Sequence, residues 1–254
     1  MEKKYRLLEN DTKKVNGKTL YRIESLRDFA GVKKGDKGGY IESDDNLSHI
    51  GACWVSDYAR VSGDAQVFGN AWIFGNAEIF GNARVSGNAR VSGNARVSDN
   101  AEIYGNARVS GNARVSGNAR VSDNAEISGN AWVCGNARVS DNAEIYGNAR
   151  VCGNARVFGY AEVYGYAEVY GDAEIRSTRD YVVLKNIWSS GRYFTYTRSN
   201  KMWKVGCFYG TGEELIAKAY RDSEVSGREY KRVVEYVEAM YADLENDERQ
   251  EAKK

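Results

Sequence analysis

Residues 87–98 read Gly-Asn-Ala-Arg-Val-Ser-Gly-Asn-Ala-Arg-Val-Ser, and this six-residue unit recurs with few changes through the middle of the chain. Every sixth residue from Val55 to Ile175 is Val or Ile. Ala lies two positions before each of them, replaced once by Cys53, and the residue between is Arg, Glu, Trp or Gln. A fixed period of this kind is the signature of an architecture in which one small unit is stacked many times.

Each unit combines a short strand with a turn. In Ala-x-Val the first and third side chains point to one side and the middle one points to the other, as in a β-strand. The following Gly and Asn or Asp enter the left-handed backbone region more easily than other residues do. A helix is excluded because its apolar residues would recur every three or four positions. The repeat therefore predicts a coil of short strands that buries Val and Ala and exposes the middle residue.

The pattern resembles the hexapeptide repeat of left-handed parallel β-helices. In that family three units form one triangular turn, so the resemblance implies about seven coils over residues 53–176, with a rise of about 4.8 Å each. Burial of Val and Ala alone does not offset the conformational entropy of so many ordered residues. We therefore expect continuous hydrogen bonds between coils, stacked Asn side chains at the corners, and caps on the two open ends.

The segment before the repeat, residues 1–52, is expected to form the N-terminal β cap. Asn16-Gly17 lies between two extended runs and predicts a β-hairpin. Leu47 is in phase with the Ala column, so the winding is expected to begin before Trp54.

The segment after the repeat, residues 177–245, predicts a small α+β domain. Three strands are expected within residues 181–208, followed by a helix that the capping box of Thr211 and Glu214 opens. A longer amphipathic helix is expected from near Gly227. Residues 246–254 are expected to be a charged tail that frays. The overall prediction is a mainly β protein, a left-handed parallel β-helix with a cap at each end.

Composition narrows the function classes. The chain has 36 Lys and Arg against 35 Asp and Glu, so no general attraction to nucleic acid or to a membrane surface is predicted. A long apolar segment and a signal-peptide core are both missing from the sequence, which predicts a cytoplasmic protein. With one His and no Cys-x-x-Cys pattern, neither a metal site nor a cofactor is predicted.

Two of the four cysteines have a spacing that matters. Cys134 and Cys152 are 18 residues apart, so triangular coils would stack them within disulfide distance. The alternative is that Cys replaces the usual Ser without pairing, as expected in a reducing compartment.

The outward residues fall on three faces when they are sorted at 18-residue spacing. One face places Arg120, Arg138 and Arg156 about 5 Å apart, which requires an anion, a carboxylate or solvent to compensate the charge. We interpret the arginine columns as a docking surface for an acidic protein or a phosphate-bearing ligand. The alternative is sequence drift in a repetitive gene, with the arginines simply solvated. The candidate binding residues on the rod are Arg90, Arg108, Arg120, Trp132, Arg138 and Arg156.

Large aromatic side chains gather at both ends of the repeat, where they are expected to contact the chain's own caps, a second copy or another protein. Proteins of the resembled family commonly form trimers, so a trimer or a dimer is expected. The candidate contact residues are Trp54, Phe68, Trp72, Phe74, Phe80, Tyr164, Tyr166 and Tyr170.

The C-terminal domain interleaves basic and aromatic residues. Arg192, Phe194 and Tyr196 would share one side of a strand, which predicts either a stacking surface for a nucleotide or the core side of a sheet. The candidate binding residues there are Arg192, Tyr196, Arg198, Trp203 and Lys204.

The sequence favours binding over catalysis. Acyltransferases of the resembled family use a His base and a loop that leaves the coil, whereas the only His here is His49, ahead of the first full coil, and no loop interrupts the repeat. No catalytic residue is therefore predicted, and an acyltransferase or a degenerate relative is the alternative. An ice-binding rod would need a lattice of Thr, which the repeat lacks.

The flanking segments resemble those of uncharacterised phage and prophage proteins. That resemblance implies an accessory factor in the cytoplasm of a host cell. Its expected function is to inhibit a host defence protein by direct binding, or to sequester a nucleotide signal.

Overall fold

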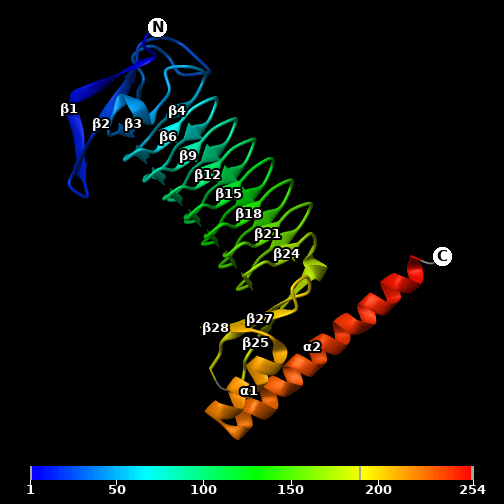
Figure 1. The fold of residues 1–254 in the computed structure, drawn as a ribbon. Helices are drawn as coiled ribbons and strands as arrows, with labels where there is room; N and C mark the ends of the chain where they lie inside the picture. The colour runs from blue at the N-terminus through cyan, green and yellow to red at the C-terminus, as the bar shows by residue number, and fades with distance from the viewer. Residues whose placement is uncertain (1, 189, 253–254) are drawn as a thin grey trace.

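The computed structural model describes residues 2–188 and 190–252, and in it the repeat winds into a parallel β-solenoid (Figure 1). Each repeat contributes one strand of two residues, and strands three repeats apart pair in parallel register. Arg90 pairs with Arg108, and Val91 pairs with Val109. Three parallel sheets therefore run along the rod, as the 18-residue sorting of outward residues predicts.

The three sheets are named here as faces A, B and C. Face A contains β3 (Lys37–Ile41), β5 (Arg60–Val61), β8 (Glu78–Ile79), β11 (Arg96–Val97), β14 (Arg114–Val115), β17 (Trp132–Val133), β20 (Arg150–Val151) and β23 (Glu168–Val169). Face B contains β4 (Trp54–Val55), β7 (Trp72–Ile73), β10 (Arg90–Val91), β13 (Arg108–Val109), β16 (Glu126–Ile127), β19 (Glu144–Ile145) and β22 (Glu162–Val163). Face C contains β6 (Gln66–Val67), β9 (Arg84–Val85), β12 (Glu102–Ile103), β15 (Arg120–Val121), β18 (Arg138–Val139), β21 (Arg156–Val157) and β24 (Glu174–Ile175).

The interior of the solenoid is built from the Ala and the Val or Ile of each repeat. These residues, such as Ala107 and Val109, have no exposed surface, whereas the residue between them, Arg108, is exposed. Alternation along a strand gives this result directly, since neighbouring side chains point to opposite sides.

Hydrogen bonds join each coil to the next. The amide of Arg96 donates to the carbonyl of Ala113 at 2.9 Å, and the amide of Ser98 donates to Val115 at 3.0 Å. At the corners Asn side chains form ladders: Asn100 Nδ2 donates to Asn118 Oδ1 at 3.0 Å, and the same bond recurs along all three corner columns. The expected inter-coil bonds and stacked Asn corners are confirmed.

The corner glycines are required by both conformation and space. Gly111 has φ +67°, a value that side chains with a Cβ rarely adopt. A Cβ at Gly111 would also lie 2.9 Å from the backbone nitrogen of Gly129 in the next coil. Asp replaces Gly at a few corners, and at Asp99 the carboxylate accepts a hydrogen bond from the amide of Gly117 at 2.9 Å.

The N-terminal cap extends face A. The hairpin predicted at Asn16-Gly17 is formed by β1 (Tyr5–Val15) and β2 (Lys18–Ser25), and β2 pairs with β3. After the short helix η1 (Asp44–Asn46), Leu47 bridges to Val67. Winding thus begins before Trp54, as expected, and the solenoid has about eight turns rather than seven because β3 and Leu47 add one.

Buried polar groups complete this cap. The Lys4 ammonium donates to the carbonyl of Cys53 at 2.7 Å, and the Tyr5 hydroxyl donates to the carbonyl of Leu47 at 2.6 Å. These donors satisfy carbonyl groups of the first turn that have no preceding coil.

The C-terminal module follows the short helix η2 (Thr178–Asp180) and caps the other end. Its antiparallel sheet has the order β25-β26-β27-β28. A fourth strand separates from the predicted third one because Gly206 turns the chain with φ +57°. Its strands are β25 (Tyr181–Lys185), β26 (Tyr193–Thr197), β27 (Met202–Val205) and β28 (Phe208–Gly210), and its helices are α1 (Gly212–Asp222) and α2 (Glu224–Glu251).

Hydroxyl groups of this module cap the last coil on each face. On face A the amide of Glu168 donates to Thr195 Oγ1 at 2.9 Å, and on face C the amide of Glu174 donates to Ser199 Oγ at 2.7 Å. On face B the Tyr181 hydroxyl donates to the carbonyl of Glu162 at 3.1 Å and accepts from the amide of Tyr164 at 3.4 Å. The expectation that both flanks act as caps is confirmed.

The long helix corrects one prediction. The capping box of Thr211 and Glu214 opens α1 as expected, but α2 begins at Glu224 and continues to Glu251. Residues 246–251 are therefore helical rather than a frayed tail, and Arg198, which follows β26, donates a hydrogen bond to Glu248 within them. Neither helix within residues 2–188 and 190–252 has the length and apolar character needed to cross a bilayer.

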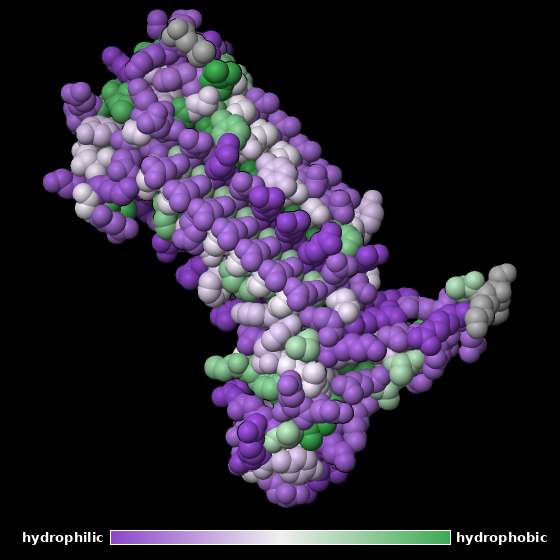
Figure 2. Space-filling model, viewed as in Figure 1, coloured by the Kyte–Doolittle hydropathy of each residue, from purple (hydrophilic) through white to green (hydrophobic). Residues whose placement is uncertain are grey.

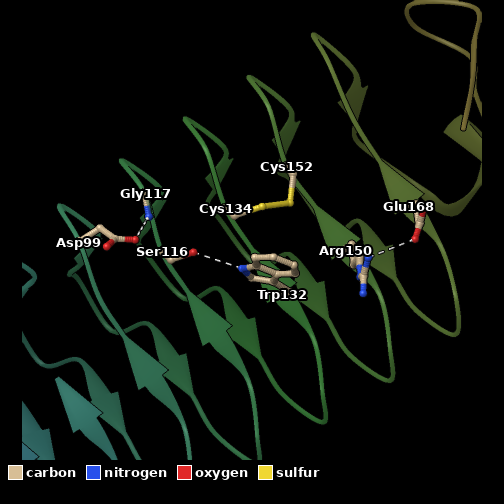
Figure 3. The surroundings of a disulfide bond; sticks show 8 residues. All are labelled: Asp99, Ser116, Gly117, Trp132, Cys134, Arg150, Cys152 and Glu168. Atoms are coloured by element: carbon tan, nitrogen blue, oxygen red, sulfur yellow. Dashed lines mark hydrogen bonds and ion pairs between the residues drawn. A yellow bond between two sulfur atoms is a disulfide. The ribbon is translucent and has the colours of Figure 1, made fainter. Parts of the chain in front are cut away.

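Cys134 and Cys152 form a disulfide between adjacent coils, with their Cα atoms 4.6 Å apart (Figure 3). The bond lies at a corner next to Trp132 of face A. Of the two alternatives that the spacing left open, the structure shows the paired cysteines. The other two cysteines are free: Cys53 is buried and Cys207 is exposed.

Gly111→Ala should destabilise the protein more than Gly165→Ala does. Both glycines have φ +67°, but a Cβ at Gly165 has no atom within 4 Å. The difference between the two variants therefore measures the clash with the next coil. We expect the free energy of unfolding of Gly111→Ala to be about 1–3 kcal/mol lower than that of Gly165→Ala. Urea denaturation of both variants measures it. Equal losses would show that the close stacking of the corners has no energetic consequence.

Reduction of the disulfide should lower the melting temperature. Opening a loop of this size costs about 3 kcal/mol, or roughly 6–12 °C in a chain of this length. Thermal melts with and without reductant check this, and Cys134→Ser should melt at the lower temperature in both conditions. Cys207→Ser is the control and should keep the response of the wild type. A reductant effect that survives in Cys134→Ser would contradict the assignment.

Candidate binding surfaces

Two of the three consecutive arginines on face C form ion pairs with glutamates of the same face. Arg120 pairs with Glu102 at 3.2 Å, and Arg156 pairs with Glu174 at 2.9 Å. Arg138 stands between them and has no ion pair or hydrogen bond from its side chain in the described part of the chain. Carboxylates therefore compensate two of the three positive charges. The guanidinium of Arg138 has no such partner among the described residues.

A groove of about 210 Å³ follows this column. Its walls include the three arginines, with Tyr104 and Phe158 at its sides. The guanidinium of Arg156 lies over the ring of Phe158, 5.5 Å from its centroid. Charged and aromatic groups therefore meet in one shallow recess, which we call the face C groove.

Acidic corners border the face C groove. Asp123 and Asp141 directly follow Ser122 and Ser140, two of the lining residues. Asp141 accepts a hydrogen bond from the amide of Gly159 at 2.8 Å, so its carboxylate also holds two coils together. Glu102 and Glu174 pair with Arg120 and Arg156, so two of the three positive charges are balanced. The groove is therefore not strongly basic.

The remaining predicted rod residues are separated from this groove. On face B, Arg108 pairs with Glu126 at 2.8 Å, while Arg90 lies beside Trp72 in register and has no ion pair among the described residues. On face A, the Trp132 indole donates to Ser116 Oγ at 3.2 Å, as Figure 3 shows, and Arg150 covers its ring. The structure thus brings together Arg120, Arg138 and Arg156 on face C, whereas Arg90 and Arg108 are neighbours on face B and Trp132 lies on face A.

A larger groove was not predicted from the sequence. It has a volume of about 390 Å³ and lies between the β1–β2 hairpin and face A. Lys18 and Leu20 of the hairpin oppose Phe80 and Arg96 of the rod. Both Arg60 and Arg96 bind Glu78, so these two guanidinium groups have a carboxylate partner within the groove. The sequence predicts the hairpin but not which face it overhangs, so no sequence signal could have found this groove.

In the C-terminal module, the interpretation of Tyr196 and Trp203 as a stacking surface is wrong. Tyr196 is 3% exposed and Trp203 has no exposed surface. Both pack with Phe194 between the sheet and the helices, where their rings lie 5.0 Å apart. Arg192 is exposed at the end of the sheet and is not part of a joint surface with them.

Lys204 and Arg198 have structural contacts instead. The Lys204 ammonium lies 3.7 Å from Glu168 and over the ring of Tyr170, so it joins the module to the last coils. Arg198 follows β26 and holds the end of α2: its guanidinium donates to Glu248 at 3.0 Å and lies 4.0 Å from Glu245. Hydrogen bonding to Arg198 lowers the pKa of Glu248. This contact explains why α2 does not fray after residue 245.

Four of the eight candidate aromatic residues at the rod ends contact the chain's own caps. Trp54 is 2% exposed and packs edge-on against Phe29 and Tyr5. Tyr164 packs edge-on against Tyr181. Cap packing, one of the three possibilities considered, therefore accounts for these residues.

Tyr166 and Tyr170 also contact the C-terminal cap, whereas the remaining four aromatic residues lie on the rod itself. Tyr166 stacks on Tyr193 with ring centroids 4.3 Å apart, and Tyr170 lies against Tyr209. Phe68 and Phe80 lie under the guanidinium groups of Arg84 and Arg96, and Trp72 and Phe74 are half-buried on the rod.

His49 lies in the N-terminal cap. Its ring stacks on Tyr5 at 4.3 Å, and its Nδ1 accepts a hydrogen bond from the amide of Lys4 at 3.1 Å. Burial lowers the pKa of His49. Within the described residues, no three or more His, Cys, Asp or Glu side chains are grouped to hold a metal ion.

Comparison with known families supports the repeat assignment. Residues 89–102, 101–117, 113–129 and 149–165 match the family model of the YdcK beta solenoid repeat. The chain is a β-solenoid repeat protein. The matched segments lie in coils from β10 to β22. They include the disulfide partner Cys152 and the groove residues Arg120 and Arg156. A search of curated proteins finds no match to the chain.

Arg198→Ala should loosen the end of α2 without affecting the solenoid. Loss of the contact with Glu248 removes the tertiary support of residues 245–251, and we expect their amides to exchange about two- to fivefold faster. Hydrogen exchange with mass spectrometry measures this. Arg192→Ala, at an exposed position near the same sheet, is the control and should leave exchange in α2 unchanged. Unchanged exchange in Arg198→Ala would show that α2 is stable by itself.

Proposed function

We propose that this protein is a non-catalytic binding protein in which a rigid rod presents a docking surface to a partner. The observation that carries the proposal is Arg138, the one guanidinium of the face C groove without a partner in the described residues. Hydrogen bonds from coil to coil fix the strand that carries it, so the backbone of the docking surface is ordered before any partner arrives. Preorganisation of this kind reduces the entropic cost of binding.

The charge balance of the groove favours one of the two expected partner classes. Glu102 and Glu174 pair with two of the three arginines, so a ligand with several phosphate charges would meet repulsion as well as attraction. A single carboxylate on a protein surface needs only Arg138 and can place apolar atoms against Tyr104 and Phe158. We therefore propose an acidic protein surface as the partner, in preference to a nucleotide signal.

The biological setting of the proposal rests on the resemblance of the flanking segments to phage and prophage proteins. In that setting the partner is a host defence protein in the cytoplasm, which the rod inhibits by direct binding. The proposal includes a left-handed coil of the hexapeptide class, which the six-residue spacing and the three strands per turn support. It also includes a homo-oligomer, a trimer or a dimer.

Charge reversal at Arg138 tests the docking surface. Arg138 and Arg114 occupy the same six-residue sequence, Gly-Asn-Ala-Arg-Val-Ser, on different faces, and both are exposed without an ion pair among the described residues. Arg138→Glu should therefore reduce capture of the partner from a host lysate by about tenfold or more, and Arg114→Glu should not. Quantitative mass spectrometry of the captured proteins provides the measurement.

Equal capture by both variants would remove the face C groove from the proposal. A rise in melting temperature with nucleotides, lost in Arg138→Glu, would favour sequestration of a nucleotide signal. A rise with acyl-CoA together with measurable acyl transfer would replace the proposal by the acyltransferase alternative.

A further inference from the structure

The outer strand of the C-terminal sheet has a free edge. β25 is the first strand in the sheet order, and among residues 2–188 and 190–252 only β26 pairs with it. Two backbone hydrogen bonds fix the pattern of that pairing: Arg198 N donates to Asp180 O, and Asn186 N donates to Arg192 O, both at 2.8 Å. Antiparallel pairs alternate between bonded and non-bonded residues.

This alternation assigns the direction of each peptide group in β25. Since Asp180 and Asn186 belong to bonded pairs, Val182 and Leu184 between them also bond to β26. The amide and carbonyl groups of Val183 and Lys185 therefore point away from the sheet. They form a row of hydrogen-bonding groups without a neighbouring strand.

β25 also lacks the features that usually protect an edge. Charges, bulges and short length keep edge strands from pairing with other chains. β1, the edge of face A, has a register shift between Leu8 and Thr12, and β28 is only three residues long. β25 reads Tyr-Val-Val-Leu-Lys, with one charge at its end. β1, in contrast, carries the charged residues Arg6, Glu9, Asp11, Lys13 and Lys14.

A groove of about 400 Å³ runs beside this edge. Tyr164 and Tyr166 of the last coil form one wall, and Tyr181 and Val183 of β25 form the other. Tyr164 is 46% exposed and Tyr166 is 49% exposed, so both rings keep surface available after their contacts with the cap. Figure 2 shows apolar surface in the region where the rod meets the C-terminal module, in contrast to the hydrophilic rod.

We propose that β25 binds an extended peptide segment of a partner protein as an additional strand. The outward peptide groups of Val183 and Lys185 supply backbone hydrogen bonds, and the tyrosine-lined groove receives alternate apolar side chains of the peptide. This division, with main-chain bonds for affinity and pockets for specificity, is how sheet edges recognise peptides. The surface is separate from the face C groove and does not depend on it.

Charge complementarity specifies the peptide further. Lys185 is exposed, and its ammonium lies over the ring of Tyr193, with no carboxylate partner among the described residues. An acidic residue in the peptide would pair with it. A second copy of β25 does not offer this, because residues 181–185 contain no Asp or Glu. The partner is therefore an apolar extended segment that carries a carboxylate, rather than a second copy of β25.

Selection from a displayed library of short random peptides tests the proposal on the full-length protein. We expect the recovered peptides to alternate apolar residues and to share an acidic one, and to slow exchange of the Val183 and Lys185 amides. Val183→Pro removes a donor that no strand uses, and should weaken binding by about tenfold or more. Lys185→Glu should also weaken binding, whereas Lys218→Glu, at an exposed position of α1, is the matched control and should not.

Several results would overturn the proposal. These are recovery of no peptide, binding that is unchanged by Val183→Pro in a variant with a native melting temperature, or equal binding of a peptide whose backbone amides are methylated. Self-association of the wild type that Val183→Pro abolishes would assign the edge to a second copy instead. Because Arg138→Glu should leave peptide binding unchanged, failure here and failure of the face C groove are distinguishable.

Discussion

The backbone hydrogen bonds between successive coils are the interaction on which the rest of this structure depends. A two-residue strand is too short to be stable alone, so each repeat exists only because another lies three repeats away in either direction. The close approach of the corners follows from this stacking. Corner glycines such as Gly111 have no room for a Cβ, and the Asn ladders convert the same spacing into side-chain bonds. At the two ends of the rod the peptide groups have no next coil to bond to, and leaving them unpaired would cost free energy. The buried Lys4 at one end and the hydroxyl of Thr195 at the other replace the missing strand.

Much of this could be predicted from the sequence because the period is strict. Alternation within Ala-x-Val fixes which residues are buried, and the 18-residue register places every outward side chain on its face. Local signals also sufficed for the hairpin at Asn16-Gly17 and for the start of α1. The errors concern residues whose surroundings are set by distant segments. Tyr196 and Trp203 alternate like surface residues, and only the position of the helices shows that their side of the sheet is the core. The last turns of α2 look polar and frayed until Arg198 is seen to hold them.

The candidate surfaces arise where the repeat is imperfect. In a column of alternating charges each arginine would have a carboxylate above or below it, and the surface would offer little to a partner. On face C three consecutive arginines break this alternation, and Arg138 is the residue left over. At the end of the rod the repeat stops altogether, and the replacement for the next coil leaves the groove of Tyr164 and Tyr166 beside β25. In this protein, groups that can bind a partner are found where the repeat departs from the pattern in which each charge and each peptide group already has a neighbour.

The 18-residue register has a consequence for how such a gene can change in length. Duplication or loss of three consecutive repeats would lengthen or shorten the rod by one full turn and leave every later side chain on its original face. Loss of a single repeat would keep the interior intact, since every unit buries the same two residues. It would, however, turn the whole downstream half, including Arg138 and the terminal module, to the neighbouring face. Variation in steps of one turn should therefore be neutral for surface recognition, whereas variation in smaller steps would redirect it.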